Sequence, residues 1–321
     1  QDQGAFDMKE LAAQLLDGYQ TDIFDVSDSE LYHTEIFERL KKEIIDYAKD
    51  PQSVKPTSRS YLIYGPSGVG KSPLIKALGN EATKNNIFCY YQHSMEYCRL
   101  FKMTGTIEPI FQVAYEKKPT ILVADNLEFM SDIKTAEVQE ATKRLIDEIK
   151  RLNKSDVPVI FVGLTNAPFR AEKALIESFQ TKIYMPMPDE KLIRHLLNSQ
   201  LAKTSCKIEE SDVEKFAKKA QGYTISELME VIEGAIMMNS RRSAKSEYFK
   251  IVDNSNKNKP IYKACSPSDP EAIKIKPSED QIQNDPLSIG ILDKALANVI
   301  PFVSDYDAVD FEEFRRSIEN N

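Results

Sequence analysis

The chain has few cysteines, and it lacks any long apolar run. Its four cysteines, Cys89, Cys98, Cys206 and Cys265, lie far apart and include no Cys-x-x-Cys pair. This spacing excludes a disulfide framework and a zinc ribbon, and it predicts reduced, buried thiols of an intracellular protein. A membrane span would need about 18 consecutive apolar residues, and no such run occurs. No signal-peptide pattern is visible either, so we expect a cytoplasmic protein.

Positive charge is also in deficit. The 321 residues include 42 Lys and Arg against 50 Asp and Glu, which gives a net charge of −8. With this balance the chain is not expected to neutralise a phosphate backbone, so no nucleic-acid partner is predicted. The hydrophobic share of 41% is that of an ordinary globular protein, and the length predicts about two domains.

One glycine-rich stretch organises the rest of the sequence. An apolar run over Tyr61–Tyr64 precedes the pattern Gly-x-x-x-x-Gly-Lys-Ser, and a helical pattern follows it. This strand, loop and helix order is that of a P-loop, whose glycines let backbone N–H groups point at a phosphate beside a helix N-terminus. Lys71 is predicted to reach the β- and γ-phosphates of ATP or ADP, and the Ser72 hydroxyl to ligate Mg²⁺. The predicted nucleotide-binding residues of the loop are Gly65, Pro66, Ser67, Gly68, Val69, Gly70, Lys71 and Ser72.

Strands alternate with helices up to Pro188, and helices dominate after it. Apolar runs without polar alternation predict a parallel sheet covered by helices on both faces. We therefore expect an α/β domain over 1–188, followed by a small helical domain over 189–252, an extended segment over 253–286 and closing helices over 287–321 that complete the small domain. The predicted strands are 61–64, 87–91, 120–124, 157–163 and 183–188, and the predicted helices include 8–19, 36–47, 107–117, 138–152, 190–201, 211–220, 226–240, 287–299 and 307–318.

The strand over 120–124 ends in an acid, Asp125, which a P-loop ATPase needs to hold Mg²⁺. In hydrolysing ATPases of this kind a glutamate normally follows and polarises the attacking water, whereas Asn126 stands here. An amide can orient water but cannot accept its proton. Glu128 is considered as a substitute, but a shift of two residues along a strand would displace its carboxylate by several ångströms. Asn126 is thus a degenerate catalytic position.

Asn166 follows the next buried strand, after Thr165. Its side-chain amide is predicted to reach the γ-phosphate or the attacking water from the neighbouring strand end. An Asn at this place is most often a turn residue when it stands alone. The three strand ends taken together favour the catalytic interpretation.

These motifs resemble those of AAA ATPases of the meiotic clade, and the tail is most similar to the vacuolar protein sorting members of that clade. The segments that carry the resemblance, besides the P-loop and Asp125, are Thr165-Asn166, 182–188, 222–228, 248–252, 264–273 and 307–318. The resemblance implies an AAA module with a small helical domain and a short β-insertion. It also implies a ring, usually a hexamer, that pulls ESCRT filament proteins through a central pore at endosomal membranes. Asp25, Val26, Ile225 and Ser226 match positions that border the adenine in this family.

The departures from the family matter for function. In the family the neighbouring protomer supplies arginines that stabilise the transferring phosphoryl group, but this chain has Ile176, Glu177 and Ser178 where they are expected. The substrate-gripping aromatic of the pore corresponds to Tyr97 or Phe101, and local packing is an equal alternative for both.

Three hypotheses follow. The first is an ATP-binding subunit with weak or absent hydrolysis, acting in a homo- or hetero-hexamer with AAA paralogues or as a regulator. The second is an active ATPase that remodels ESCRT-like filaments. The third is a P-loop kinase or GTPase, against which Thr165-Asn166 and the helical small domain argue.

Overall fold

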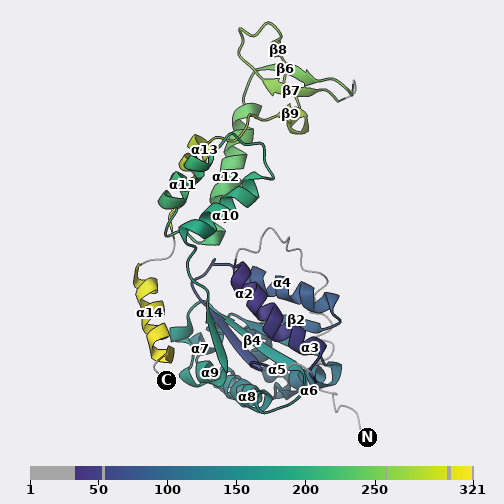
Figure 1. The fold of residues 1–321 in the computed structure, drawn as a ribbon, viewed down its shortest axis with the longest axis vertical. Helices are drawn as coiled ribbons and strands as arrows, with labels where there is room; N and C mark the ends of the chain where they lie inside the picture. The colour runs from purple at the N-terminus through teal and green to yellow at the C-terminus, as the bar shows by residue number, and fades with distance from the viewer. Residues whose placement is uncertain (1–32, 53–54, 257–258, 302–304, 320–321) are drawn as a thin grey trace. The chain divides into compact units, whose positions relative to one another are not determined.

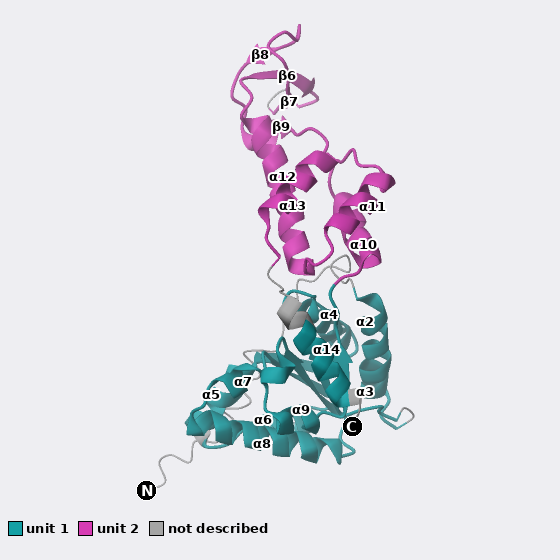
Figure 2. Ribbon diagram, turned by 90° about the vertical axis from the view of Figure 1, so that its left-hand side faces the viewer, with its two compact units in different colours: residues 1–187, 303–321 teal, residues 188–302 magenta. Residues whose placement is uncertain are grey.

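The computed structural model describes residues 33–52, 55–256, 259–301 and 305–319. The chain divides into two compact units, residues 1–187 with 303–321 and residues 188–302 (Figure 2). The helix predicted over 8–19 and the adenine-bordering positions Asp25 and Val26 lie outside the described residues. Within the described residues, no helix combines the length and the apolarity that crossing a membrane requires.

The first unit is built on a five-stranded parallel sheet (Figure 1). Its strand order is β2-β3-β4-β1-β5. Four of the five strands both start and end within two residues of their predicted bounds, and the α/β fold class is confirmed. Because β4 lies between β3 and β1, the loops after these three strands meet at one edge of the sheet. The strands are β1 (Ser60–Tyr64), β2 (Phe88–His93), β3 (Thr120–Asp125), β4 (Val159–Thr165) and β5 (Thr181–Tyr184).

Helices cover both faces of this sheet. Side chains alternate across a strand, and along β1 Leu62 and Tyr64 enter one buried apolar cluster while Tyr61 and Ile63 enter the other. Apolar residues on both faces explain why the strands read as continuous apolar runs. The helical segments that precede β5 in the sequence are α2 (Thr34–Leu40), the π-helical η2 (Lys41–Asp46), α3 (Tyr47–Lys49), α4 (Lys71–Lys84), α5 (Ser94–Thr104), α6 (Glu108–Lys117), α7 (Phe129–Asp132), α8 (Ala136–Asn153), η3 (Pro168–Arg170) and α9 (Lys173–Ser178).

The last helix, α14 (Asp305–Glu319), belongs to the first unit and not to the small domain that it was expected to complete (Figure 2). Phe314 lies edge-on to Tyr64 of β1, with ring centroids 5.1 Å apart. Phe311 is buried and contacts Tyr184 of β5 and Phe169 of η3, at 5.9 and 5.4 Å between centroids. Aromatic burial of this kind decides where the helix packs, whereas its neighbours in the sequence suggested the small domain.

The second unit combines a helical part with a small sheet (Figure 2). The sheet has the order β8-β6-β7-β9, in which β6 pairs antiparallel with β7 and β8. Most of it lies in the segment that was predicted to be extended. The elements are α10 (Glu190–Leu201), α11 (Glu210–Lys219), α12 (Ile225–Ala244), β6 (Tyr248–Asp253), β7 (Ile261–Ala264), β8 (Ile273–Lys274), η4 (Glu279–Gln281), β9 (Ile282–Gln283) and α13 (Ile289–Asn298).

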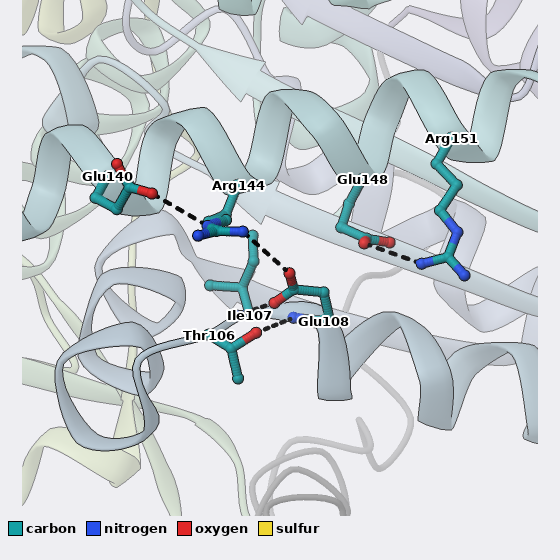
Figure 3. A network of polar contacts seen from close by, with 7 residues as sticks. All are labelled: Thr106, Ile107, Glu108, Glu140, Arg144, Glu148 and Arg151. Carbon is teal, nitrogen blue, oxygen red and sulfur yellow. Dashed lines mark hydrogen bonds and ion pairs between the residues drawn. The ribbon is translucent and has the colours of Figure 1, made fainter.

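A polar network joins α6 to α8 on the first unit (Figure 3). Arg144 pairs with Glu140 at 3.1 Å and with Glu108 at 3.8 Å. Two turns beyond Arg144 along α8, Arg151 pairs with Glu148 at 3.4 Å. Only 5% of Glu148 is exposed, and its Oε2 atom has no hydrogen-bond partner among the described residues. Burial therefore raises the pKa of this carboxyl, against the opposing effect of Arg151.

Replacing Glu148 with Gln should raise the thermal midpoint by a few degrees at pH 8. The folded-state pKa lies above the usual 4.5, so the protonated carboxyl favours folding at low pH, and this contribution is lost as the pH rises through the folded-state pKa. Gln keeps the neutral shape at every pH, so the advantage should shrink toward acid. Thermal melts of both proteins across the pH range would measure this. Glu140→Gln, at a half-exposed position of the same helix, is the control. An advantage that is independent of pH would contradict the prediction.

Candidate nucleotide site

The P-loop follows β1 and leads into α4, as its sequence predicts. Gly68 and Gly70 have φ values of 79° and 96°, which residues with a Cβ rarely adopt. At Gly65 a Cβ would lie 2.1 Å from the carbonyl oxygen of Met185, so only glycine fits beside that backbone. The loop therefore needs glycine at these places for its shape, and the N-terminus of α4 faces it with the positive end of a helix dipole.

Lys71 is the buried cation of this loop. Its Nζ atom donates to the carbonyl oxygens of Gly65 at 2.8 Å and Pro66 at 2.6 Å. Burial lowers the pKa of Lys71 to about 8, while Glu128 and then Asp125 act in the opposite direction. The ammonium is therefore mostly charged at neutral pH and lies where phosphate oxygens would be held.

Asp125 and Ser72 come together at the end of β3. The Ser72 hydroxyl donates to Oδ2 of Asp125 at 3.3 Å, and Oδ1 accepts the backbone N–H of Asn126 at 2.7 Å. Tyr91 of β2 donates its hydroxyl to the same Oδ2 atom. Burial, and then the charge of Asp125, raises the pKa of Tyr91. A hydroxyl and a carboxylate are the hard oxygen ligands that Mg²⁺ prefers, so Ser72 and Asp125 fit the predicted metal role.

The Asn126 side chain bridges His93 and Glu128. His93 caps α5 by accepting the Met95 backbone N–H on Nδ1 at 3.1 Å, so we assign its proton to Nε2. We orient the Asn126 amide so that both of its groups find a partner: its oxygen accepts from Nε2 at 2.9 Å, and its nitrogen donates to Oε1 of Glu128 at 2.8 Å. The backbone of Asn126 is left-handed, with a φ of 59°, a conformation that Asn tolerates better than most residues.

Glu128 lies inside the site, contrary to the expectation from strand spacing. The left-handed turn at Asn126 ends the strand, so the two-residue shift does not move the chain onward along a straight line. Glu128 is 7% exposed, and its Oε1 atom accepts the backbone N–H of Asn166 at 3.2 Å. Its charge is also the largest effect that raises the pKa of Lys71. An Asn directly after the strand was the one sequence signal for such a turn.

The remaining predicted positions are placed differently. Asn166 follows β4, and its backbone joins it to Glu128 as described above. Ile225 and Ser226 begin α12 in the second unit, where Thr224 and Glu227 form a capping box. They are thus at a helix N-terminus, which is a suitable place for a ligand contact, and their adenine role stays a prediction.

The three positions where the family has arginines differ in burial. Ile176 is 4% exposed and belongs to the apolar cluster on one face of the sheet, and Ser178 is also buried. The Glu177 side chain is 58% exposed and pairs with Lys173 at 3.4 Å. Nearby, Arg170 pairs with Asp132 at 2.8 Å. Of these three positions, only 177 therefore faces solvent.

Tyr97 is a core residue and not a pore residue. It is 1% exposed, lies within α5, and contacts the ring of Phe161 edge-on at 6.3 Å between centroids. Phe101 is partly buried and packs against the same apolar cluster. Local packing is thus the correct interpretation for Tyr97, and it also accounts for the position of Phe101.

The tetrapeptide at 153–156, Asn-Lys-Ser-Asp, has the letters of the guanine-recognition pattern of GTPases, and sequence reasoning missed it. Its position excludes that role. It joins the end of α8 to the start of β4, and the Asn153 side chain accepts from the Ser60 hydroxyl at 2.7 Å and donates to the Ser178 carbonyl at 2.8 Å. Ser60 is the first residue of β1, whereas the P-loop follows the last one. The two motifs therefore lie at opposite ends of the strands.

Comparisons with known proteins agree with this geometry. Residues 61–187 match the family "ATPase family associated with various cellular activities (AAA)". Over 293 residues the chain is 25% identical to vacuolar protein sorting-associated protein 4B of Pongo abelii, covering 86% of this chain and 66% of that protein. It is also 25% identical over 269 residues to the Arabidopsis thaliana protein SUPPRESSOR OF K(+) TRANSPORT GROWTH DEFECT 1, covering 80% and 60%.

A solved structure supports the fold in the same way. The crystal structure of the FIGL-1 AAA domain in complex with ADP matches with a TM-score of 0.69 at 16% identity, covering 99% of each chain. The chain spans slightly less than two thirds of the length of the vacuolar sorting relative named above.

Proposed function

We propose that this chain holds ATP or ADP with Mg²⁺ and hydrolyses ATP weakly or not at all, because residues 61–187 match the AAA family and the chain is similar to vacuolar protein sorting-associated protein 4B. Lys71 and the loop from Gly65 to Ser72 would hold the phosphates, and Ser72 with Asp125 would hold the metal. Bound Mg²⁺ would neutralise phosphate charge there. Asn166 would face the γ-phosphate from β4.

The Asn126 bridge is the observation that carries the proposal. At the position of the water-polarising glutamate, the amide donates to Glu128 and accepts from His93. It has no basic atom to take a proton from water. Glu128 itself accepts from Asn126 and from the backbone of Asn166, so these two donors already occupy the oxygen that would have to receive a proton from water.

The absence of the arginines bears on which role the chain would have in a ring. Position 177 carries a carboxylate, which would repel the γ-phosphate of a neighbouring protomer. The chain would therefore act as a subunit or regulator beside active AAA paralogues in a homo- or hetero-hexamer. ESCRT-type filament proteins are the substrate class that its relatives suggest, with a cytoplasmic location and peripheral contact with endosomal membranes.

An active ATPase is the second candidate, because of Glu128. Its buried carboxylate is close enough to Lys71 to raise the pKa of that lysine more than Asp125 does. If Glu128 took the proton from the attacking water, the base would stand two positions later in the sequence than the usual glutamate. Measured turnover decides between the two candidates.

The test is equilibrium binding of a fluorescent ATP analogue beside steady-state turnover on one sample. We expect tight binding and turnover near background. Lys71→Ala should weaken binding by roughly tenfold to a hundredfold, since a hydrogen bond to a charged group contributes about 1.5–3 kcal/mol. Lys84→Ala, at the exposed far end of the same helix, is the control. Rapid turnover that Lys71→Ala abolishes would favour the second candidate.

A further inference from the structure

Tyr91 is a third hydrogen-bond donor to Asp125, the carboxylate proposed to hold the metal, besides Ser72 and the backbone of Asn126. The AAA motifs described above do not include a tyrosine at this position. The hydroxyls of Tyr91 and Ser72 both donate to Oδ2 of Asp125, while Asn126 donates to Oδ1. We propose that the Tyr91 hydroxyl competes with the Mg²⁺ of the bound nucleotide for Asp125, so that the ion held there adds little to nucleotide affinity. The inference rests on the proposed nucleotide binding.

The position of Tyr91 in β2 explains how it reaches the carboxylate. In the parallel β2–β3 pair, Tyr91 is paired with Val123 and His93 is paired with Asp125. Asp125 therefore lies two residues closer to the carboxyl ends of the strands than Tyr91 does. A tyrosine side chain is long enough to span that step along the same face, since residues two apart share a face. A shorter side chain at this place would leave Oδ2 to Ser72 alone.

The ring of Tyr91 is held independently of its hydroxyl. It packs against the apolar cluster that contains β1 and α4 residues, and Nζ of Lys76 lies 5.9 Å from the ring centroid. The hydroxyl is therefore presented to Asp125 by a fixed ring, at little cost in side-chain freedom when the bond forms. Removing only the hydroxyl should leave the ring in place.

The competition follows from the chemistry of the carboxylate. A hydroxyl that donates to an ionised oxygen makes one of the stronger classes of hydrogen bond. Mg²⁺ demands near-ideal octahedral geometry and takes one or two carboxylates from the protein, and Asp125 is the carboxylate that faces Ser72 here. A donor already on that oxygen neutralises part of its charge, and Tyr91 donates to the same oxygen as Ser72. Nucleotide phosphates would still be bound by the backbone of the P-loop and by Lys71.

The experiment compares nucleotide affinity with and without Mg²⁺. A fluorescent ADP analogue is titrated into the full chain in saturating Mg²⁺ and in EDTA, so that hydrolysis plays no part. We expect Mg²⁺ to change the Kd of the unaltered protein by less than about threefold, and to change that of Tyr91→Phe by at least about tenfold more. The matched control is Tyr115→Phe, because the Tyr115 hydroxyl is buried in α6 without a hydrogen-bond partner among the described residues. It should behave as the unaltered protein.

Two further readouts make the result decisive. Thermal melts show whether each variant is folded, and Tyr91→Leu removes the hydroxyl in a second way if Tyr91→Phe is unstable. If folded variants that lack the hydroxyl keep the Mg²⁺ dependence of the unaltered protein, the inference is wrong. If the unaltered protein already depends strongly on Mg²⁺, it is also wrong. If no form binds the analogue with or without Mg²⁺, the proposed function fails, and this inference fails with it.

Discussion

Asn126→Glu, which restores the usual glutamate, is expected to destabilise the protein and to leave ATP turnover near background. The backbone at 126 is left-handed, and this conformation costs about 1–2 kcal/mol for residues other than Gly, Asn and Asp. The new carboxylate would also replace an amide that donates to Glu128 at 2.8 Å. Two buried carboxylates at that distance repel each other, and one of them would remain protonated and useless as a base.

Asn126→Gln separates the two causes. It has the length of Glu and the same backbone cost but no charge, so chemical denaturation should find it more stable than Asn126→Glu by more than about 1 kcal/mol. The gap should narrow toward acid as the paired carboxyls take up a proton. Equal stability of the two variants would show that Glu128 lies farther from position 126 than the structure places it. Turnover gained by Asn126→Glu would contradict the prediction directly.

Ile176→Arg should be the most destabilising of the arginine restorations, at about 3–5 kcal/mol. It would put an unpaired cation into an apolar cluster at a position that is 4% exposed. The next residue provides the matched control, since the Glu177 side chain is 58% exposed. Glu177→Arg gives up only a surface ion pair with Lys173, which contributes about 0–1 kcal/mol.

Urea denaturation of both variants checks this. If Ile176→Arg unfolds at the same urea concentration as the unaltered protein, helix α9 does not bury position 176 and the other two positions need to be examined again. If the prediction holds, an arginine can be returned to this chain only at 177. Restoring the arginine role in a mixed ring should then be attempted with Glu177→Arg alone.

The sequence by itself determined the sheet, the phosphate loop and the substitution on which the proposed loss of hydrolysis rests. Apolar runs over 120–124 and 157–163 could be buried on both faces only in a covered parallel sheet. The spacing from Gly65 to Ser72 fixed the loop because left-handed turns and close approach, as at Gly70 and Gly65, require glycine. Asn126 in place of an acid was visible without any structure, since the strand end was already located by Asp125.

Only the tertiary structure decided what surrounds those residues. Glu128 joins the site through one left-handed residue, and Tyr91 reaches Asp125 from another strand. Helix α14 packs on the first unit through Phe311 and Phe314, about 120 residues or more beyond the aromatic rings of β5 and β1 that they meet. Periodicity reports which face of an element is apolar, but it does not report which distant element covers that face. Contacts between distant segments depend on side-chain shape and backbone dihedrals, which is why these features could not be derived from the order of residues.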